Sequence, residues 1–210
     1  MPLPDPKTAF PVTLPDGSKH AGTVFLSAVI KHPRFEVGDN TYASDFSPPK
    51  NWASHLAPYL FDFSQETLRI GKFCQIAHGV RFITSSANHA TDGLSCYPFP
   101  VFINAVPDGY QPDTRDTMVG HDVWLGYGAM ILPGAQIGHG AIIGAGAVVR
   151  GTVPPYSIVT GNPGTVIKKR FDDATISELL EIAWWDWPKE KIERAIPAIM
   201  AGDVAGLRTV

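Results

Sequence analysis

Between Val119 and Pro154 the apolar positions of the chain recur every six residues. In units of six the segment reads VGHDVW, LGYGAM, ILPGAQ, IGHGAI, IGAGAV and VRGTVP, with Val, Leu or Ile always first and Val or Ala always fifth. A period of six fits neither an amphipathic helix nor the alternation of a half-buried strand. It is typical of a parallel β-helix, in which three units close one triangular coil, the aliphatic residue stacks inward and the small fifth residue fits near a corner. The glycine after the aliphatic residue suits a turn or a close approach of backbones.

The same register is found upstream, with interruptions. Val37 opens VGDNTY, Ile70 opens IGKFCQ and Ile76 opens IAHGVR. The small fifth position is then held by Thr41, Cys74 and Val80. We therefore expect an all-β solenoid over residues 37–170.

Two long segments interrupt the repeats, at 43–68 and 84–117. Both are too polar, and too rich in proline, aspartate and aromatic residues, to be coils. Loops of this length inside a compact domain are uncommon and are usually functional or disordered. The second excursion favours function because it carries Asn88, His89, Asp92, Tyr97 and Phe99.

The two ends of the chain lack the repeat. Residues 1–36 are dotted with proline and predict an N-terminal arm packed over the solenoid or partly disordered. Residues 171–210 change to a helical period: Asp172 or Asp173 is placed to cap a first helix, and Pro188 suits the first turn of a second, which Pro197 would bend or shorten. Because the open edge of a solenoid invites pairing, we expect these helices to cap its end.

The composition is that of one globular domain, with 210 residues, 18% charged residues and a mean hydropathy of +0.01. The net charge of −3 argues against a general nucleic-acid-binding protein. Cys74 and Cys96 do not make a disulfide framework. No basic and then apolar leader opens the chain, and no apolar run approaches the roughly 20 residues that span a bilayer. We expect a soluble, cytoplasmic protein that binds neither nucleic acid nor membranes.

Five segments together identify a family. In chain order they are IGKFCQIAHGV, ANHATDGLSCYPF, VGHDVWLGYGAMILPGAQIGHGAIIGAGAVV, VTGNPGTVIKKRFDD and LLEIAWWDWP. With them the chain resembles the hexapeptide-repeat acetyltransferases, and among these the xenobiotic acetyltransferases that act on chloramphenicol or streptogramin A antibiotics such as virginiamycin. The resemblance implies left-handed coils, which run against the general rule for parallel strands. It also implies a homotrimer and acetyl-CoA as the acetyl donor, with no metal ion.

Transfer of an acetyl group from a thioester to a hydroxyl needs a base for the hydroxyl proton, donors for the developing oxyanion and a slot that holds both substrates. Histidine suits the base because its ordinary pKa is near neutral. The resemblance assigns this role to His89. His121 and His139 occupy the third position of their repeats, and we expect them to be exposed turn residues.

Three further side chains are candidates for support of His89. The resemblance places Trp124 beside the catalytic histidine, as a wall of the thioester slot, and an aromatic residue there also suits packing against a neighbouring subunit. Asn88 and Asp92 would either hold His89 in one tautomer or turn the loop, and both alternatives stay open. Cys74 is rejected as a nucleophile because it occupies a small inward position, so direct transfer is preferred over an acetyl-enzyme.

Coenzyme A carries a pyrophosphate and a 3′-phosphate, which attract cations and backbone N–H groups. Lys168, Lys169 and Arg170 form the one tight basic cluster, directly after the last coil, where the family binds coenzyme A. A solvated charge run is the alternative. The remaining residues assigned to the cofactor are small or lie at the exit turn: Gly126, Gly144, Ala145, Gly161 and Asn162. Gly126 is also a candidate N–H donor to the thioester oxygen.

The acceptor region departs from the family. Relatives have a tyrosine-rich YSYY stretch where this chain has Asn40-Thr41-Tyr42-Ala43. We assign Tyr42, Tyr97 and Phe99 to the acceptor pocket, and another hydroxyl metabolite remains an alternative to the antibiotics.

Two other classes of protein remain as alternatives. Hexapeptide solenoids also serve as non-catalytic scaffolds or binding proteins, and carbonic anhydrases on similar coils bind zinc between subunits. A zinc site needs three histidines brought together, and His78, His121 and His139 all lie in coils. Neither class accounts for the NH..DG loop, the KKRF run or WWDWP, so an acetyltransferase is the preferred hypothesis.

Overall fold

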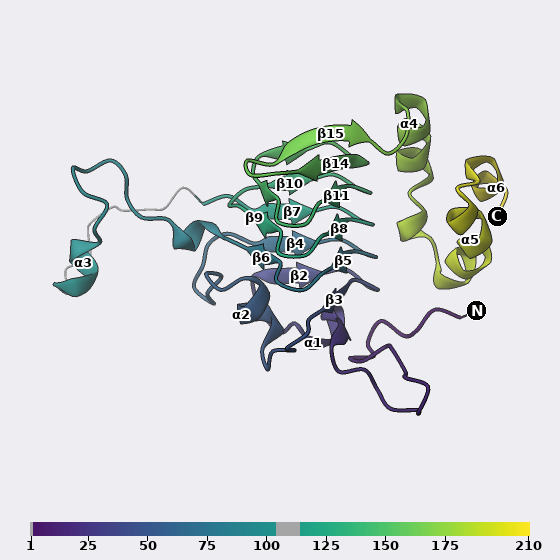
Figure 1. The fold of residues 1–210 in the computed structure, drawn as a ribbon, viewed down its shortest axis with the longest axis horizontal. Helices are drawn as coiled ribbons and strands as arrows, with labels where there is room; N and C mark the ends of the chain where they lie inside the picture. The colour runs from purple at the N-terminus through teal and green to yellow at the C-terminus, as the bar shows by residue number, and fades with distance from the viewer. Residues whose placement is uncertain (1, 104–113) are drawn as a thin grey trace.

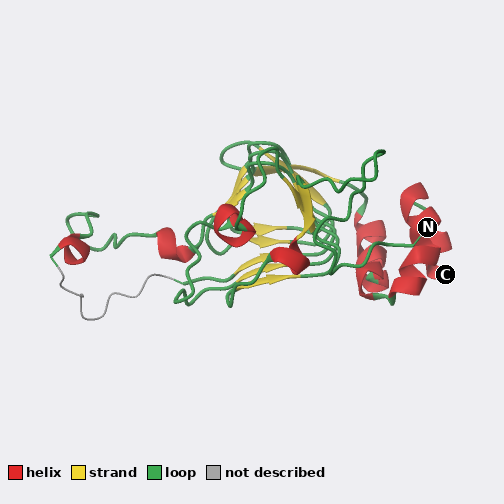
Figure 2. Ribbon diagram, turned by 90° about the horizontal axis from the view of Figure 1, so that it is seen from below, coloured by secondary structure: helices red, strands yellow, loops and turns green. Residues whose placement is uncertain are grey.

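The chain winds through three sheets in cyclic order, and successive turns stack on one another (Figure 1). The structure, a computed structural model, describes residues 2–103 and 114–210. Part of the second excursion, 104–113, therefore lies outside the described residues. From β7 (Thr117–Val119) onward the chain enters the five-stranded, the seven-stranded and the three-stranded sheet in turn. Along the stack, the sheets surround one interior (Figure 2).

The strands are short and mostly parallel, as the repeat predicts. The seven-stranded sheet contains β1 (Thr23–Phe25), β3 (Tyr42–Ser44), β5 (Gln75–Ile76), β8 (Trp124–Leu125), β11 (Ile142–Ile143), β14 (Ser157–Thr160) and β15 (Thr165–Lys169). The five-stranded sheet contains β13 (Thr152–Val153), β10 (Gln136–Ile137), β7, β4 (Leu68–Ile70) and β2 (Phe35–Val37). The three-stranded sheet contains β12 (Val148–Val149), β9 (Met130–Ile131) and β6 (Arg81–Phe82). Among described strands, only β1 on β3 and β15 on β14 pair antiparallel.

Coils in the middle of the stack contain 18 residues, as the backbone of His121 and the ring of His139 illustrate by meeting across one coil. The last coil contains 16, since Gln136 pairs with Thr152 and Ile142 with Ile158. Where the first excursion intervenes, the offset between stacked residues is 33, as for Glu36 and Arg69. Where the second intervenes it is 49, as for Lys72 and His121. The excursions are thus inserted without disturbing the register of the coils.

The predicted inward positions form the core. The first and fifth residues of all six repeats are at most 4% exposed. These residues are Val119, Leu125, Ile131, Ile137, Ile143, Val149, Val123, Ala129, Ala135, Ala141, Ala147 and Val153. The upstream assignment is also confirmed, since Thr41, Cys74 and Val80 are buried, although Val37 is only partly so. Burial of two apolar residues in every six supplies the main driving force for stacking.

Glycine has two separate roles in the repeat. At the second position a Cβ on Gly126 would lie 2.8 Å from the Ala145 nitrogen and the Ile143 oxygen of the next coil, so stacking excludes any side chain there. At the fourth position Gly146 has a φ of +67°, which is the left-handed region that favours glycine. The sequence suggested that one glycine, directly after the aliphatic residue, serves either a turn or a close approach of backbones. In the structure the second position makes the close approach, and the fourth position has the positive φ.

Several boundaries differ from those expected from the sequence. The segment assigned to the N-terminal arm contributes β1, α1 (Leu26–Val29) and the start of β2. The sequence misses β1 because an antiparallel strand does not follow the six-residue repeat. Residues 43–44, 68 and 117 belong to strands, so both excursions are shorter than expected. The first excursion contains α2 (Trp52–Leu56), and the second contains the 3₁₀ helix η1 (Ser85–Ala87) and α3 (Phe99–Phe102).

The C-terminal helices lie beside the stack and not over its last coil (Figure 1). They are α4 (Asp173–Ile182), the 3₁₀ helix η2 (Trp184–Asp186), α5 (Lys189–Ala201) and α6 (Val204–Arg208). Asp172 caps α4 by accepting from the Thr175 nitrogen, and Pro188 precedes α5, which continues through Pro197. Trp184 packs on Phe73, which fixes the helices against a side of the coil. The edge strand β14 is covered by β15 instead of by a helix.

His121 and His139 are half-buried, so the expectation that they are exposed turn residues is wrong. Their rings stack with centroids 5.0 Å apart, and Trp185 packs over both. The Nδ1 of His121 accepts from the Lys72 backbone nitrogen at 2.8 Å, and the Nδ1 of His139 accepts from that of His121 at 2.9 Å. Burial and the neighbouring His139 lower the pKa of His121 to about 4, and burial lowers the pKa of His139.

We predict that the folded protein loses stability as the pH falls from about 6.5 toward 4. In this window the unfolded chain binds protons on these two histidines that the folded chain does not bind, so each lowers the free energy of unfolding by at most about 1.4 kcal/mol per pH unit. Urea unfolding at fixed protein concentration and several pH values measures the slope. His139→Gln should flatten it, whereas His20→Gln, on an exposed residue of the arm, should not. Equal slopes in all three proteins would contradict the prediction.

Candidate active site

His89 lies on the second excursion, which projects from the stack on the side opposite the C-terminal helices (Figure 1). Its Nδ1 is 2.9 Å from the carbonyl oxygen of Cys96. A carbonyl only accepts, so Nδ1 carries the proton and Nε2 of the neutral ring carries the lone pair. This is the tautomer in which an exposed Nε2 serves as a base. The sequence offered no signal for Cys96 as the orienting group, because a backbone carbonyl leaves no trace in residue type.

Asn88 and Asp92 do not orient the ring of His89 in the described part of the chain. No hydrogen bond joins either side chain to His89 there. The backbone nitrogen of Asn88 donates to the Ser85 oxygen at the end of η1, a contact that does not involve the Asn88 side chain. Both Asn88 and Asp92 belong to the loop's exposed surface.

The first residues of the His89 loop are hydrogen-bonded to the first excursion. Glu66, which is buried, accepts at Oε1 from the Ser86 nitrogen at 2.7 Å. The hydroxyls of Ser64 and Ser86 lie 2.7 Å apart. The end of the first excursion thus fixes the start of the second, and the direction in which the His89 loop leaves the stack is set by partly buried polar contacts.

Trp124 lies on β8 and is 50% exposed, with its side chain on the outer face of the seven-stranded sheet. In register it follows Gln75 and precedes Ile142. The His89 loop leaves the stack between β6 and β7, at another corner. No hydrogen bond or ring contact joins His89 to Trp124 within the described chain, so one chain does not bring the two together.

The small residues assigned to the cofactor do come together. Leu125, Ile143 and Val159 are in register, so the residues one and two positions after them line the corner between the seven- and three-stranded sheets, where Thr160 and Tyr127 adjoin four small residues. This small-residue column consists of Gly126, Gly144, Ala145 and Gly161. The Gly126 nitrogen donates to the Ile143 oxygen at 2.7 Å, so it is committed to the ladder and the expectation of a free oxyanion donor there is wrong. Asn162 is exposed in the turn after this column, before β15.

The basic cluster is divided by its contacts. Arg170 donates from Nη1 to the Gly140 oxygen at 2.7 Å, lies 3.6 Å from Asp122 and packs over Tyr156. Burial raises the pKa of Asp122, while Arg170 opposes that rise. Arg170 is therefore held at the corner that faces the helices, which argues against its assignment to phosphate binding.

The two lysines of the cluster lie on the edge strand β15. Lys169 forms an ion pair with Asp173 at the start of α4. Lys168 is exposed and has no ion pair with any described residue. Of the cluster, Lys168 is thus the cation best placed to meet a phosphate.

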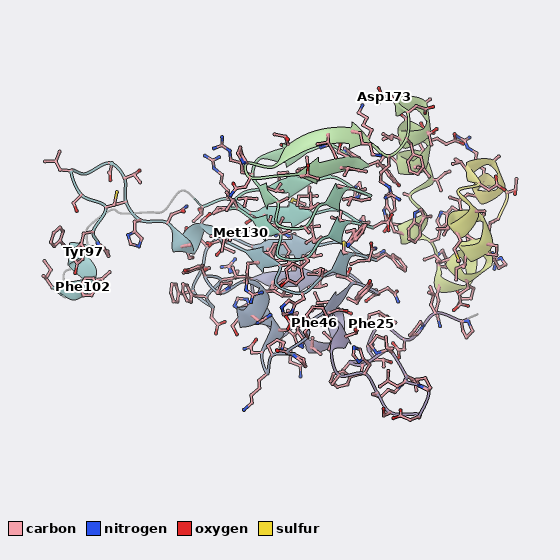
Figure 3. All side chains as sticks on the ribbon, in the orientation of Figure 1. Phe25, Phe46, Tyr97, Phe102, Met130 and Asp173 are labelled. Carbon is pink, nitrogen blue, oxygen red and sulfur yellow. The ribbon has the colours of Figure 1, made fainter. Side chains whose placement is uncertain are left out.

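The residues assigned to the acceptor pocket do not meet within one chain. Tyr42 is half-buried on β3, opposite Phe25. Tyr97 and Phe99 are exposed on the outer part of the loop, with rings 4.7 Å apart, and Tyr97 also packs near Phe102. Figure 3 shows Tyr97 and Phe102 well clear of the stack and of Phe25. One chain, as described, does not bring all three assigned residues into one pocket.

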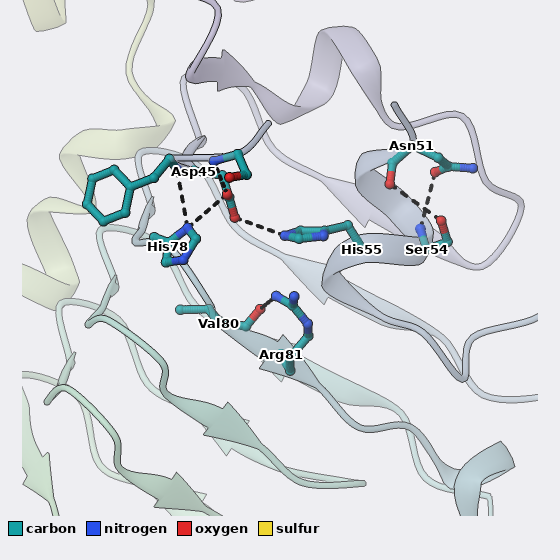
Figure 4. A network of polar contacts seen from close by, with 9 residues as sticks. Asp45, Asn51, Ser54, His55, His78, Val80 and Arg81 are labelled. Carbon is teal, nitrogen blue, oxygen red and sulfur yellow. Dashed lines mark hydrogen bonds and ion pairs between the residues drawn. The ribbon is translucent and has the colours of Figure 1, made fainter. Parts of the chain in front are cut away.

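A carboxylate with two imidazoles, which sequence reasoning missed, lies at the foot of the small-residue column (Figure 4). Asp45 is 6% exposed; its Oδ1 is 2.8 Å from Nδ1 of His78 and its Oδ2 is 2.9 Å from Nε2 of His55. Desolvation alone would raise the pKa of Asp45, but the Ser47 nitrogen and the two histidines hold it below its ordinary value. No periodicity reveals this group, because its members come from a coil corner and from α2.

Cys74 is a poor nucleophile, as expected. Burial raises the pKa of its thiol to about 12, and the thiol is directed at the Gly120 oxygen. Within residues 2–103 and 114–210, no group of three or more His, Cys, Asp or Glu side chains could hold a metal ion. Among the helices that are described, none is long and apolar enough to cross a membrane.

One concavity of the described chain lies elsewhere. It is a groove of about 620 Å³ along the outer face of the five-stranded sheet, and it extends to the corner of His121 and His139. None of the residues assigned to catalysis, cofactor or acceptor lines it.

Comparison with known proteins places these observations in a family. The family model of the bacterial transferase hexapeptide (six repeats) matches residues 116–151. The chain is 40% identical to a chloramphenicol acetyltransferase of Agrobacterium fabrum (strain C58), over 88% of this chain and 90% of the relative. It is 36% identical to a virginiamycin A acetyltransferase of Staphylococcus aureus, over 98% and 92%. It is 47% identical to a probable macrolide acetyltransferase of Lysinibacillus sphaericus, over 63% and 76%. The chain is an acyltransferase and belongs to the hexapeptide-repeat acetyltransferases, in the group that includes the chloramphenicol and virginiamycin A enzymes.

Proposed function

We propose that the protein transfers the acetyl group of acetyl-CoA to a hydroxyl of a small xenobiotic such as chloramphenicol, with His89 as the general base. The observation that carries this proposal is the contact between His89 Nδ1 and the Cys96 carbonyl, which leaves Nε2 as an exposed lone pair. The family's relatives carry the names of acetyltransferases for three kinds of antibiotic. Because Tyr42 is the one tyrosine in the chain's counterpart of the YSYY stretch, the acceptor is the point that needs direct assay.

The proton transfers of the reaction need no group beyond those of the two substrates and one imidazole. Nε2 of His89 takes the proton of the acceptor hydroxyl while its oxygen attacks the thioester carbonyl. The tetrahedral intermediate then expels the coenzyme A sulfur, which takes the proton from the imidazolium. The products are an acetyl ester and free coenzyme A, and His89 returns to its neutral state. The buried, neutral thiol of Cys74 supports direct transfer.

The active unit is a homotrimer of left-handed coils, in which the His89 loop of one subunit meets the Trp124 face of the next. Two features support this arrangement. The loop leaves from one corner while Trp124 and the small-residue column occupy another face and corner. Both surfaces are also apolar and exposed, with Tyr97, Phe99 and Phe102 on the loop and Tyr127 beside Trp124 on the stack. Together they would enclose a slot that one chain leaves open.

Acetyl-CoA lies along the small-residue column, with Lys168 near its phosphates. The absence of side chains at Gly126, Gly144 and Gly161 lets a pantetheine chain approach the backbone. We also assign the protein to the cytoplasm, where a reducing environment suits its two free cysteines. Chloramphenicol, streptogramin A compounds, sugars and serine, each tested by thiol release from acetyl-CoA, would identify the acceptor and distinguish an enzyme from a scaffold.

We predict that His89→Ala lowers kcat by about 10²- to 10⁴-fold, the usual contribution of a general base. Acetyl-CoA should bind as before, because His89 contacts the reacting hydroxyl and not the cofactor. Thiol release and calorimetric titration measure the two effects. Cys74→Ala, as the control, should keep native turnover. Near-native turnover in His89→Ala on a verified acceptor would disprove the assignment.

The trimer predicts complementation between two inactive subunits. His89→Ala removes the base, and Ala145→Trp blocks the small-residue column without touching the loop. In a random one-to-one mixture of the two subunits, a shared interface recovers one intact site in each mixed trimer, which amounts to about one quarter of native activity. Light scattering should give the mass of three chains. A monomeric mass with full activity, or no recovery in verified mixed trimers, would exclude shared sites.

We predict that Lys168 and Arg170 have different roles, one in cofactor binding and the other in stability. Lys168→Ala should raise KM for acetyl-CoA about threefold to tenfold with kcat unchanged, as expected for a solvent-exposed ionic contact that is equal in ground and transition states. Arg170→Ala should instead lower the free energy of unfolding by about 0.5–1.5 kcal/mol, because the Gly140 carbonyl and Asp122 lose a partly buried partner. Steady-state kinetics and urea unfolding separate the two. An unchanged KM in Lys168→Ala would leave this lysine as a solvated charge.

A further inference from the structure

The corner that carries the small-residue column continues downward as a ledge of rings. Ala43, Ile76 and Leu125 are in register, so the residues two positions later occupy equivalent corner sites. These are Asp45, His78 and Tyr127, with Phe46 next to Asp45. The Gly128 nitrogen donates to the His78 oxygen, and the Gly146 nitrogen to the Tyr127 oxygen, so the column is continuous. Small residues at its upper end thus give way to rings at its lower end.

The three rings form one surface, which we call the ring ledge: Phe46, His78 and Tyr127. The His78 centroid is 4.8 Å from that of Phe46 and 5.4 Å from that of Tyr127, with interplanar angles of 32° and 33°. Phe46 is 84% exposed and Tyr127 is 58% exposed. The two exposed rings lie on either side of the imidazole and directly below the column assigned to pantetheine. They are therefore placed to contact a second substrate.

The buried carboxylate of Asp45 fixes the ring of His78. Asp45 holds Nδ1 of His78 at 2.8 Å, and the Phe46 nitrogen lies 3.2 Å from the same atom. Asp45 is itself held by His55 of α2 and by the Ser47 nitrogen. Burying a carboxylate is costly unless several groups satisfy it. The carboxylate is the closer of the two groups and only accepts, so Nδ1 carries the proton and Nε2 of His78 carries the lone pair left for a ligand.

We propose that the ring ledge is the acceptor-binding surface and that it selects acceptors with a planar or aromatic group next to the hydroxyl to be acetylated. The planar group packs on Phe46 and Tyr127, and a hydroxyl or amide N–H of the acceptor donates to Nε2 of His78. Asp45 is a positioning residue that acts through His78. This inference rests on the proposed function, because it needs the thioester to lie at the upper end of the same corner. It also explains how the chain dispenses with the tyrosines flanking Tyr42 in relatives.

The test uses the full-length enzyme with chloramphenicol, which has a nitrophenyl ring beside its hydroxyls. Phe46→Ala and His78→Ala should each raise KM for chloramphenicol roughly tenfold, the loss expected for one aromatic contact or one hydrogen bond. KM for acetyl-CoA and kcat at saturating acceptor should stay within about twofold, because the lost contacts are equal in ground and transition states. Phe10→Ala, on an exposed phenylalanine of the N-terminal arm, is the matched control and should change neither constant.

Asp45 is tested by a double-mutant cycle. Asp45→Asn should raise KM for chloramphenicol in the native background but not in a His78→Ala background, because a residue that acts through His78 has no further effect once His78 is gone. A purely structural role would instead lower kcat and thermal stability equally in both backgrounds. Circular dichroism and light scattering establish that each variant is folded and has the native mass.

The outcomes separate this inference from the proposed function. If the native enzyme releases no thiol from acetyl-CoA with any acceptor, the proposed function fails and the ledge fails with it. If the native enzyme acetylates chloramphenicol but Phe46→Ala and His78→Ala keep its KM, the ring ledge alone is overturned. A change of mass in Phe46→Ala would show that the ledge is an interface between copies of the chain, which would also overturn it.

Discussion

Close stacking of successive coils is the constraint on which the rest of the structure depends. Coils approach so closely that no side chain fits at Gly126, and the backbone of each coil bonds to the next in a fixed register. Residues 18 apart in the middle of the stack, and 16 apart in its last coil, therefore lie directly above one another, and a property repeated at these intervals becomes a continuous column on the surface. The buried aliphatic columns stabilise the stack, while the columns at the corners remain available for other purposes.

The three corners of the coil have different roles. At the first, the stacked rings of His121 and His139 receive Trp185, and Arg170 joins Gly140 and Asp122, so this corner holds the C-terminal helices. At the second, small residues above and rings below form the open strip to which we assign both substrates. From the third, between β6 and β7, the His89 loop leaves the stack. The loop that carries His89 and the strip assigned to the substrates lie at different corners of the coil. A complete site is therefore expected only between chains.

The two excursions add polar and candidate catalytic groups without altering the register of the coils. Offsets of 33 and 49 residues show that each is a pure insertion into the coil register. Their polar contacts with the stack and with each other are buried: Glu66 ties the root of the His89 loop to the first excursion, and Asp45 ties α2 to the corner at His78. The loop itself supplies the Cys96 carbonyl that sets the tautomer of His89.

The amino-acid sequence alone determined the period, the inward positions and the family, because each of these is a local pattern that repeats and is read without knowledge of distant contacts. It also predicted the role of Cys74 as a buried thiol and the cap at Asp172. Only the tertiary structure decided that Arg170 faces the helices, that His121 and His139 are half-buried, and that Asp45 joins two histidines. These contacts depend on which corner an insertion leaves and where it returns, and that geometry is set by packing between segments far apart in the chain.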